Sequence, residues 1–385
     1  MRPRFHLRVA RRIAANRVRR WLGRPAIPYK VLWNTTYYCN SRCLSCNVWR
    51  IYPGEGSQGG EIQRDDVRRI LSSLGPDLLW LTMTGGEPTL KLHLAETVND
   101  VHDACPNLDF ITVNTNALVP RQTVKVMRRI AEHCRRAEVL VVLSLDGVGA
   151  VHDRIRGVEG NFEAVMETRR QILELQRELP HLALCIQSTV SEHNLDHMDE
   201  LMAFCRSNGD EHLLTFAQEA ELYRNYGDGR DVTVSRDVLG AIEALARAYR
   251  PRRARDLVQW AHLRLLRHHT ATRRAPVPCS AGSSTLTLGP RGEVSGCLFL
   301  DNPMGRAQDH QHDLRRVLAS DRGRAVQAAC RSCHQCWTNC ESFTSMLASP
   351  VTTLVRAIGA RPPALVVEAP REGGLVASRP HVRRP

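Results

Sequence analysis

Apolar runs alternate with helical patterns over much of the chain. Six runs are rich in Val, Leu and Ile and have the length of buried strands, at residues 31–36, 78–84, 110–114, 139–145, 182–190 and 213–216. In five segments between them, apolar residues recur with helical spacing, at residues 63–74, 92–104, 121–135, 161–177 and 195–207. Strands that alternate with helices indicate βαβ units and an α/β fold with a parallel sheet. Ligands of such sheets bind at the carboxyl ends of the strands.

The pattern changes after the sixth strand. Residues 236–268 have an Arg-rich helical pattern, which ends at Pro276 and Pro278. A β-hairpin is expected at residues 284–288 and 293–299, with a turn at 289–292, and a short helix is expected at 314–328. Beyond Pro350, Pro, Arg and Ala dominate with little periodicity, which predicts disorder. We therefore expect a basic arm at 1–29, a core domain at 30–235, a helical linker at 236–275, a cysteine-rich module at 276–345 and a disordered tail at 346–385.

The composition is that of a globular protein with more than one unit. The 385 residues are 43% apolar and 24% charged, and a single core stops growing at about 250 to 300 residues. No apolar run reaches the roughly 18 residues of a membrane span, and the N-terminus lacks the features of a secretory signal. We therefore expect a cytoplasmic protein, in which clustered thiols bind metal rather than form disulfides.

Nearly all of the net charge of +13 lies at the N-terminus. The first 54 residues hold twelve Lys and Arg and no acid, whereas the rest of the chain holds 41 basic and 40 acidic residues. This nearly neutral body argues against nucleic acid as a partner.

Apolar residues of the arm recur at three- and four-residue steps, which predicts an amphipathic basic helix. The apolar stripe consists of Leu7, Ala10, Ala14, Val18 and Trp21. Such a helix could lie on an anionic membrane, peripheral to its inner face, or dock a protein partner. A solvated helix is the alternative, because the stripe is rich in Ala and is interrupted by Arg11.

Nine of the thirteen cysteines fall into groups, whereas Cys105, Cys134, Cys185 and Cys205 stand alone in apolar or helical surroundings and are expected in the core. The first group, Cys39-x3-Cys43-x2-Cys46, directly follows the first strand. Three thiolates on one loop can hold three irons of a 4Fe–4S cubane and leave the fourth iron without a protein ligand. The alternative is a zinc site that a remote fourth ligand completes.

The remaining grouped cysteines lie near the C-terminus. They are Cys279 and Cys297, followed by Cys330-x2-Cys333-x2-Cys336-x3-Cys340. Such a set can hold further iron–sulfur clusters, and zinc is again the alternative.

The motifs at the strand ends, taken in order, resemble the radical SAM superfamily. Cys39, Cys43 and Cys46 after the first strand are followed by Gly85-Gly86-Glu87-Pro88 after the second. Asn114-Thr115-Asn116 follows the third strand, and Ser144-Leu145-Asp146-Gly147 and then Arg156 follow the fourth. The resemblance covers roughly residues 30–220 and implies a partial (β/α)6 barrel. It also implies a 4Fe–4S cluster on the three cysteines, and S-adenosylmethionine (SAM) that chelates the open iron and is cleaved reductively to a 5'-deoxyadenosyl radical.

The same resemblance implies the SAM-binding residues. Gly85, Gly86, Glu87 and Pro88 would contact the amino group, since glycines let a backbone approach closely and Glu87 can accept a hydrogen bond. Ser144 and Asp146 would bond the ribose, Arg156 would pair with the carboxylate, and Asn114 would also bind SAM. Without the family context, Gly85-Gly86-Glu87-Pro88 would be an ordinary turn, Ser144 and Asp146 would mark a strand end, and Arg156 would be an exposed Arg at a helix start. Ser45 stands where the family usually has an aromatic residue, so the adenine contact is expected from Trp49 or Tyr38.

The C-terminal cysteines, with Gly292-x4-Cys297, resemble a SPASM or twitch module, which carries auxiliary 4Fe–4S clusters. The full SPASM pattern has seven cysteines and this chain has six, so one or two auxiliary clusters are expected. The resemblance implies an oxidoreductase that abstracts hydrogen from a peptide or protein, with flavodoxin or ferredoxin as electron donor. A small-molecule or lipid substrate, or a non-catalytic electron-transfer role, is the alternative.

The catalytic base and the peptide contacts are less defined by the sequence. Sulfatase-maturating relatives have a base, Asp, after an auxiliary cysteine, but Leu298 follows Cys297 here, so no catalytic base is assigned. Peptide contacts are expected from residues 218–231, through Glu219, Glu221, Tyr223, Arg224 and Tyr226, unless this stretch is an ordinary surface loop.

Overall fold

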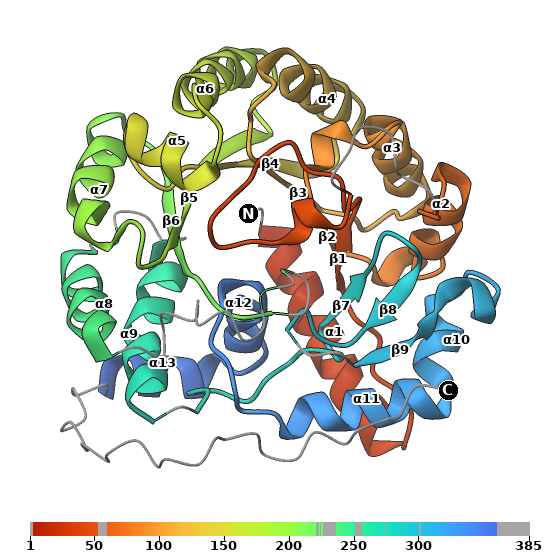
Figure 1. Ribbon diagram of the computed structural model, residues 1–385. Helices are drawn as coiled ribbons and strands as arrows, with labels where there is room; N and C mark the ends of the chain where they lie inside the picture. Colours follow the sequence, from red (N-terminus) through yellow and green to blue (C-terminus); the bar gives the residue numbers. More distant parts are fainter. Residues whose placement is uncertain are drawn as a thin grey trace.

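The computed structural model describes residues 3–52, 60–220, 223, 225, 236–249, 251, 256–272, 274–299 and 302–359. Six parallel strands lie side by side in chain order and form a curved sheet (Figure 1). They are β1 (Lys30–Asn34), β2 (Trp80–Thr84), β3 (Phe110–Thr115), β4 (Glu138–Ser144), β5 (Leu182–Val190) and β6 (His212–Phe216). This arrangement confirms the predicted α/β partial barrel.

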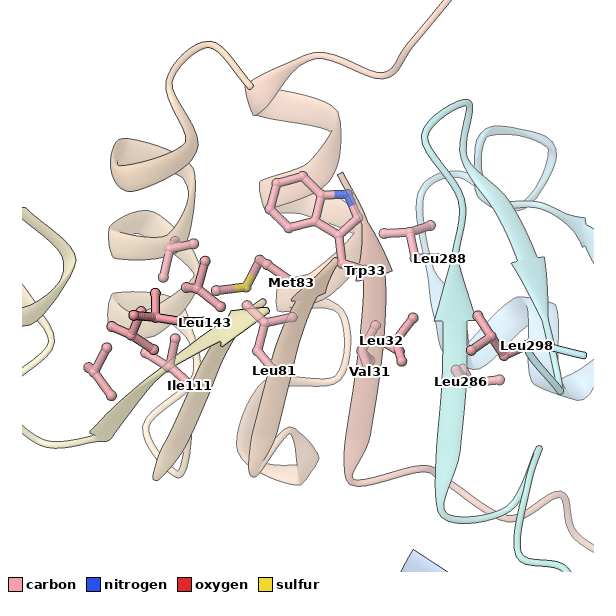
Figure 2. Packing of buried hydrophobic residues seen from close by; sticks show 14 of the residues in the cluster. Val31, Leu32, Trp33, Leu81, Met83, Ile111, Leu143, Leu286, Leu288 and Leu298 are labelled. Atoms are coloured by element: carbon pink, nitrogen blue, oxygen red, sulfur yellow. The ribbon is translucent and has the colours of Figure 1, made fainter. Parts of the chain in front are cut away.

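Helices form a layer around the outside of this sheet (Figure 1). They are α2 (Arg64–Ser72), α3 (Leu94–Ala104), α4 (Pro120–His133), α6 (Asn161–Glu178) and α7 (Met198–Ser207), while the short α5 (Ala150–Arg156) follows β4 and packs beside α6. Their apolar faces pack on the outer side of the strands, whose buried side chains include Val31, Leu81, Met83, Ile111 and Leu143 (Figure 2). Packing on one continuous sheet holds the strand ends, and with them the functional residues, in a fixed arrangement.

The C-terminal hairpin extends the same sheet. β7 (Thr285–Leu288) pairs in parallel with β1, from Lys30↔Thr285 to Trp33↔Leu288. The antiparallel strands β8 (Glu293–Ser295) and β9 (Pro303–Arg306) follow at the edge. Leu286, Leu288 and Leu298 join the core of the barrel (Figure 2). The expected hairpin is present, and it shares both hydrogen bonds and core with the six parallel strands.

Helices from the C-terminal half lie between β6 and β7. They are α8 (Arg236–Ala248), α9 (Asp256–Thr272) and α12 (Asn339–Ala348), while α10 (Leu314–Ala319) and α11 (Asp321–Ser332) pack beside β9. The edge of β6 is covered by two side-chain amides, since Gln259 and Asn339 both donate to the carbonyl of Leu214, at 3.1 and 2.7 Å. Thr344 of α12 bonds Thr285 of β7 across 3.4 Å. These contacts close the open side of the barrel.

Helix α1 (Pro3–Trp21) packs against the amino ends of the strands. Phe5 and Val9 are buried against Trp80 and Phe110, at the starts of β2 and β3. The buried face is therefore opposite the stripe that the sequence predicted. Leu7, Val18 and Trp21 of that stripe are 53%, 56% and 84% exposed. The helix was predicted correctly, but aromatic and β-branched residues at positions 5 and 9 fill the barrel end, and the Ala-rich stripe does not.

The expected disordered tail begins with a helix. α13 spans Pro350–Gly359, because Val351, Leu354, Val355 and Ile358 recur at helical spacing. Its Ala357 is buried, and the Ala357 carbonyl accepts a 2.8 Å hydrogen bond from Arg264 of α9. Residues 360–385 of the expected tail lie outside the described residues. Among the helices that the structure describes, none has the length and apolar character needed to cross a membrane.

Candidate active site

The three-cysteine loop leaves β1 and is held by backbone hydrogen bonds from two sides. On one side, the N–H groups of Gly86 and Glu87 donate to the carbonyls of Thr36 and Tyr38 at 2.7 and 2.8 Å. On the other side, Arg42 and Leu44 donate to carbonyls at the end of α5, both at 2.9 Å. The loop that carries Cys39, Cys43 and Cys46 is therefore fixed by the second strand end and by the helix after the fourth.

Glycines allow both contacts. Gly85 has φ +131°, and a Cβ there would lie 2.6 Å from the carbonyl oxygen of Thr36. Gly157, at the C-cap of α5, has φ +65°, and a Cβ there would lie 2.6 Å from the carbonyl oxygen of Arg42. The sequence predicted that Gly85 and Gly86 admit a ligand, and the structure shows that they also admit the backbone of the cysteine loop. Gly157 was missed, because a glycine after a helix ordinarily marks only a C-cap.

Glu61 is a buried support of the loop that the sequence did not reveal. Its carboxylate accepts from the hydroxyl of Thr36 at 2.8 Å and from the N–H of Tyr37 at 3.0 Å. Lys91 pairs with it at 2.7 Å, and both side chains are nearly excluded from solvent. No motif surrounds this residue, so only its buried position marks it.

Glu87 links two strand ends. One carboxylate oxygen accepts from Thr89 and Thr115, and the other accepts from the N–H of Asn116 at 2.7 Å. Burial raises the pKa of this carboxyl, and these hydrogen bonds oppose the increase. The amide of Asn116 in turn donates to Asn40 and Ser41 of the loop, both at 2.8 Å. The third strand end thus also holds the cysteine loop.

One cavity brings together most of the residues that the sequence singled out. Its lining includes Cys39, Cys43, Cys46, Gly85, Gly86, Glu87, Asn114, Ser144, Asp146 and Arg156. Pro88 is buried at the start of a short 3-10 helix and does not line the cavity. Of the two residues expected near adenine, Trp49 lines the cavity and Tyr38 does not. Further lining residues, which the sequence did not indicate, are Gln187, Thr189, Thr215 and Phe216.

Arg156 and Asp146 form a buried ion pair beside the cysteines. Their side chains are 2.8 Å apart, and Arg156 also lies 3.7 Å from the sulfur of Cys43. The N–H of Thr189 donates to Asp146 at 2.7 Å. His152 accepts a 3.0 Å hydrogen bond from the backbone of Asp146, and burial lowers the pKa of this imidazole to about 3, which keeps it a neutral acceptor.

The C-terminal cysteines divide between two cavities. Five of them line a second cavity together with Gln218, Glu219 and Phe299, namely Cys279, Cys297, Cys330, Cys333 and Cys336. Cys340 instead lines the first cavity, with the neighbouring Thr338 and Asn339. The carbonyl of Cys340 is held by the buried Lys30, whose Nζ lies 2.9 Å away. The sequence grouped all six as metal ligands; Cys340 lines the first cavity and the other five line the second, and Gln218 and Phe299 line both.

The cysteine thiols of both cavities are buried, which disfavours their charged form. Burial raises the pKa of Cys39 and Cys43, and it raises the pKa of Cys279 and Cys330 to about 12. Ligation to cationic iron would remove this cost of burying thiolates.

The peptide-contact segment is only partly described. Ala220 and Tyr223 pack near the cavity, and Tyr223 lines it. The backbone carbonyl of Tyr223 accepts a 2.9 Å hydrogen bond from Asn47, next to Cys46. Glu219 lines the second cavity. Glu221, Arg224, Tyr226 and the rest of residues 226–231 lie outside the described residues.

Comparison with known proteins agrees with this site. Residues 33–205 match the Radical SAM superfamily, whose members are enzymes. Enzymes of this superfamily use a 4Fe–4S cluster and SAM, and the cysteine-rich C-terminal region is of the kind that carries auxiliary clusters.

Two curated relatives show how far the likeness extends. The chain is 24% identical to pre-heme d1 synthase of Dinoroseobacter shibae, over 46% of this chain and 41% of the relative. It is 26% identical to the sporulation killing factor maturation protein SkfB of Bacillus subtilis, over 48% of this chain and 41% of the relative. The match thus spans about two fifths of each relative's length.

The likeness in fold to solved structures extends beyond the region that matches these relatives in sequence. The solved structure of anSMEcpe with bound AdoMet and Cp18Cys peptide has a TM-score of 0.56 to this chain at 15% identity. The likeness covers 80% of this chain and 85% of that one. It therefore includes C-terminal elements as well as the six-stranded barrel.

Proposed function

We propose that this enzyme is a radical SAM oxidoreductase that abstracts hydrogen from a peptide or protein substrate. The observation that carries the proposal is the first cavity, in which Cys39, Cys43 and Cys46 meet the strand-end motifs and the C-terminal residues Thr338 and Asn339. The residues expected to hold the cluster and SAM therefore line one space with the edge of the cysteine-rich region.

In this proposal, Cys39, Cys43 and Cys46 would hold a 4Fe–4S cluster, which would supply the electron for the cleavage of SAM. The backbone at Gly85 and Gly86 lies against the cysteine loop, and in this proposal it would contact the amino group of SAM. Arg156 pairs with the SAM carboxylate, and Asp146, Ser144 and Asn114 bond polar groups of the nucleoside. Cys279, Cys297, Cys330, Cys333 and Cys336 would hold auxiliary iron, which would supply an electron acceptor.

The polarity of the cavity favours a peptide over a tetrapyrrole. Among the lining residues that the structure describes, Arg156 is the one cation, and Asp146 neutralises it. A tetrapyrrole substrate carries several carboxylates, and buried sites bind such carboxylates with cationic side chains. The cavity instead presents hydroxyl and amide groups from Thr189, Gln218, Thr338 and Asn339, and such groups bond peptide amides. SkfB, a maturation protein, and peptide-bound anSMEcpe support the same class.

The test is hydrogen transfer into 5'-deoxyadenosine under anaerobic, reducing conditions. Peptides encoded by neighbouring genes, made with deuterated side chains, are incubated with the iron-loaded protein and SAM, with flavodoxin or dithionite as reductant. We expect deuterium in 5'-deoxyadenosine, and none with the triple Ala variant at Cys39, Cys43 and Cys46. Deuterium that comes from a labelled lipid or small metabolite and not from a peptide would contradict the substrate class. No 5'-deoxyadenosine at all would contradict radical chemistry.

A further inference from the structure

Helix α1 has two apolar faces, and only one is used by the fold. Phe5, Val9 and the half-buried Ile13 pack into the amino end of the barrel. On the opposite side, Leu7, Val18 and Trp21 are more than half exposed, as is Leu22 just beyond the helix. The other face anchors the helix, and this face is exposed among the residues that the structure describes.

The arginines of α1 divide in the same way. Arg4 and Arg8 pair with Asp109, and Arg12 pairs with Asp77. Arg11, Arg17 and Arg20 of the helix, and Arg24 just beyond it, are exposed and form no ion pair with an acid among the described residues. The helix itself contains no acidic residue. Its free positive charge therefore flanks the exposed apolar stripe, away from the barrel.

A second exposed apolar face lies close to the first. In α13, Val351, Leu354, Val355 and Ile358 form one stripe, and each is more than half exposed. The guanidinium of Arg17 donates to the carbonyl of Ala348 at 3.3 Å, two residues before α13 begins. The start of α13 is thus adjacent to the C-terminal half of α1.

We propose that α1 and α13 together form a docking surface for an anionic membrane. Large aliphatic residues and an edge Trp between arginines suit the boundary of acyl chains and headgroups, where Arg extends its charge to phosphate. An acid-free cationic face matches an anionic lipid surface, and membrane-bound α1 would leave the cavity at the carboxyl ends of the strands pointing away from the lipid. The surface is independent of the proposed substrate.

Vesicle flotation of the full-length, iron-loaded protein tests the surface. Vesicles of phosphatidylcholine with 30% phosphatidylglycerol are compared with phosphatidylcholine alone, at low and high salt. We expect flotation with the anionic vesicles only, weakened by salt. The double variant Val18→Ser, Trp21→Ser should reduce the bound fraction at least tenfold, and so should Val351→Ser, Val355→Ser.

The matched control is Leu92→Ser, which removes a side chain that is 71% exposed on another part of the surface. It should float like the wild type. Circular dichroism of each variant shows whether it is folded. Equal flotation of wild type and folded variants, or no flotation of the wild type, overturns the proposal. A dimer that the α1 variants dissociate, without vesicle binding, would assign the face to a second copy of the chain and overturn it as well.

Discussion

Gly157 and Gly160 differ in whether a Cβ atom at the position would collide with the cysteine loop. Both have left-handed backbone, with φ +65° and +74°, but a Cβ at Gly160 would meet nothing within 4 Å. A Cβ at Gly157 would meet the carbonyl of Arg42, in the middle of the cysteine loop. The two positions therefore share the cost of left-handed backbone, and only Gly157 has the steric contact.

We expect Gly160→Ala to cost about 1 kcal/mol of unfolding free energy and to keep its iron. Gly157→Ala should cost more and displace the loop, so that it retains less iron on Cys39, Cys43 and Cys46. Iron content and thermal unfolding of the two variants, prepared side by side, measure the difference. Equal iron in both would mean that the loop tolerates the displacement.

His152 makes stability depend on pH. Its pKa is lowered to about 3 in the folded protein, whereas an unfolded His titrates near 6.5. The unfolded state therefore binds the proton first as pH falls, and stability is lost from about pH 6.5 down towards pH 3, by up to about 1.4 kcal/mol per pH unit. His152→Asn should be less stable at pH 7 and lose less stability on acidification. Urea unfolding at pH 7.5 and pH 5 checks this, and parallel losses in both proteins would contradict it.

At the level of elements, the hydrophobic pattern predicted the strands and helices of the barrel well, but it predicted the packing and structure at the ends of the chain poorly. The expected strand at residues 182–190 coincides with β5, and the expected helix at 161–177 with α6 within one residue. Their buried faces are set by local periodicity. The pairing of β7 with β1 joins residues far apart in the chain, and periodicity carries no information on such pairs. The choice between the two apolar faces of α1 likewise depended on the shape of the barrel end.

Buried polar side chains fix α1 to the rest of the molecule. The amide of Asn16 donates to the carbonyls of Ile27 and Ser283 at 2.9 and 3.1 Å, and its oxygen accepts from the N–H of Ile27. Asn16→Ala would leave these backbone groups buried without partners, so we expect a loss of about 1 to 3 kcal/mol. Asn107→Ala, which removes one bond near the surface, is the control and should cost less. Chemical denaturation measures both, and equal costs would show that the Asn16 contacts add nothing.

At the level of the whole molecule, the motifs predicted the first cavity better than the second. Seven of the eight expected SAM-site residues line one cavity with the three cysteines, because motifs at the ends of adjacent parallel strands must meet. The division of the C-terminal cysteines could not be predicted. Cys336 and Cys340 are four residues apart, but Cys340 begins the helix that fills the barrel opening and so lines the other cavity.

Iron counting tests this division. Ala at Cys39, Cys43 and Cys46 should remove about four irons, one cubane, and leave the auxiliary iron. Cys336→Ala should lower the auxiliary iron, whereas Cys340→Ala should leave it unchanged because Cys340 lies in the first cavity. Cys134→Ala, a buried cysteine outside both cavities, is the control. If Cys340→Ala lowers the auxiliary iron, Cys340 is a ligand of that iron and the division is wrong. Zinc in place of iron would contradict the cluster assignment.

The parallel pair of β1 and β7 also has a consequence for biosynthesis. Lys30 and its partner Thr285 are separated by 255 positions, so at about 5 to 20 residues per second the ribosome makes β7 on the order of 10 to 50 s after β1. Until then, one edge of β1 has no partner strand and is open to mispairing with other chains. The cysteine loop leaves β1, so the strand that carries it lacks one neighbour until β7 is made, although β2, β3 and α5 already hold the loop itself. Iron loading is therefore expected to be more complete once β7 has paired with β1.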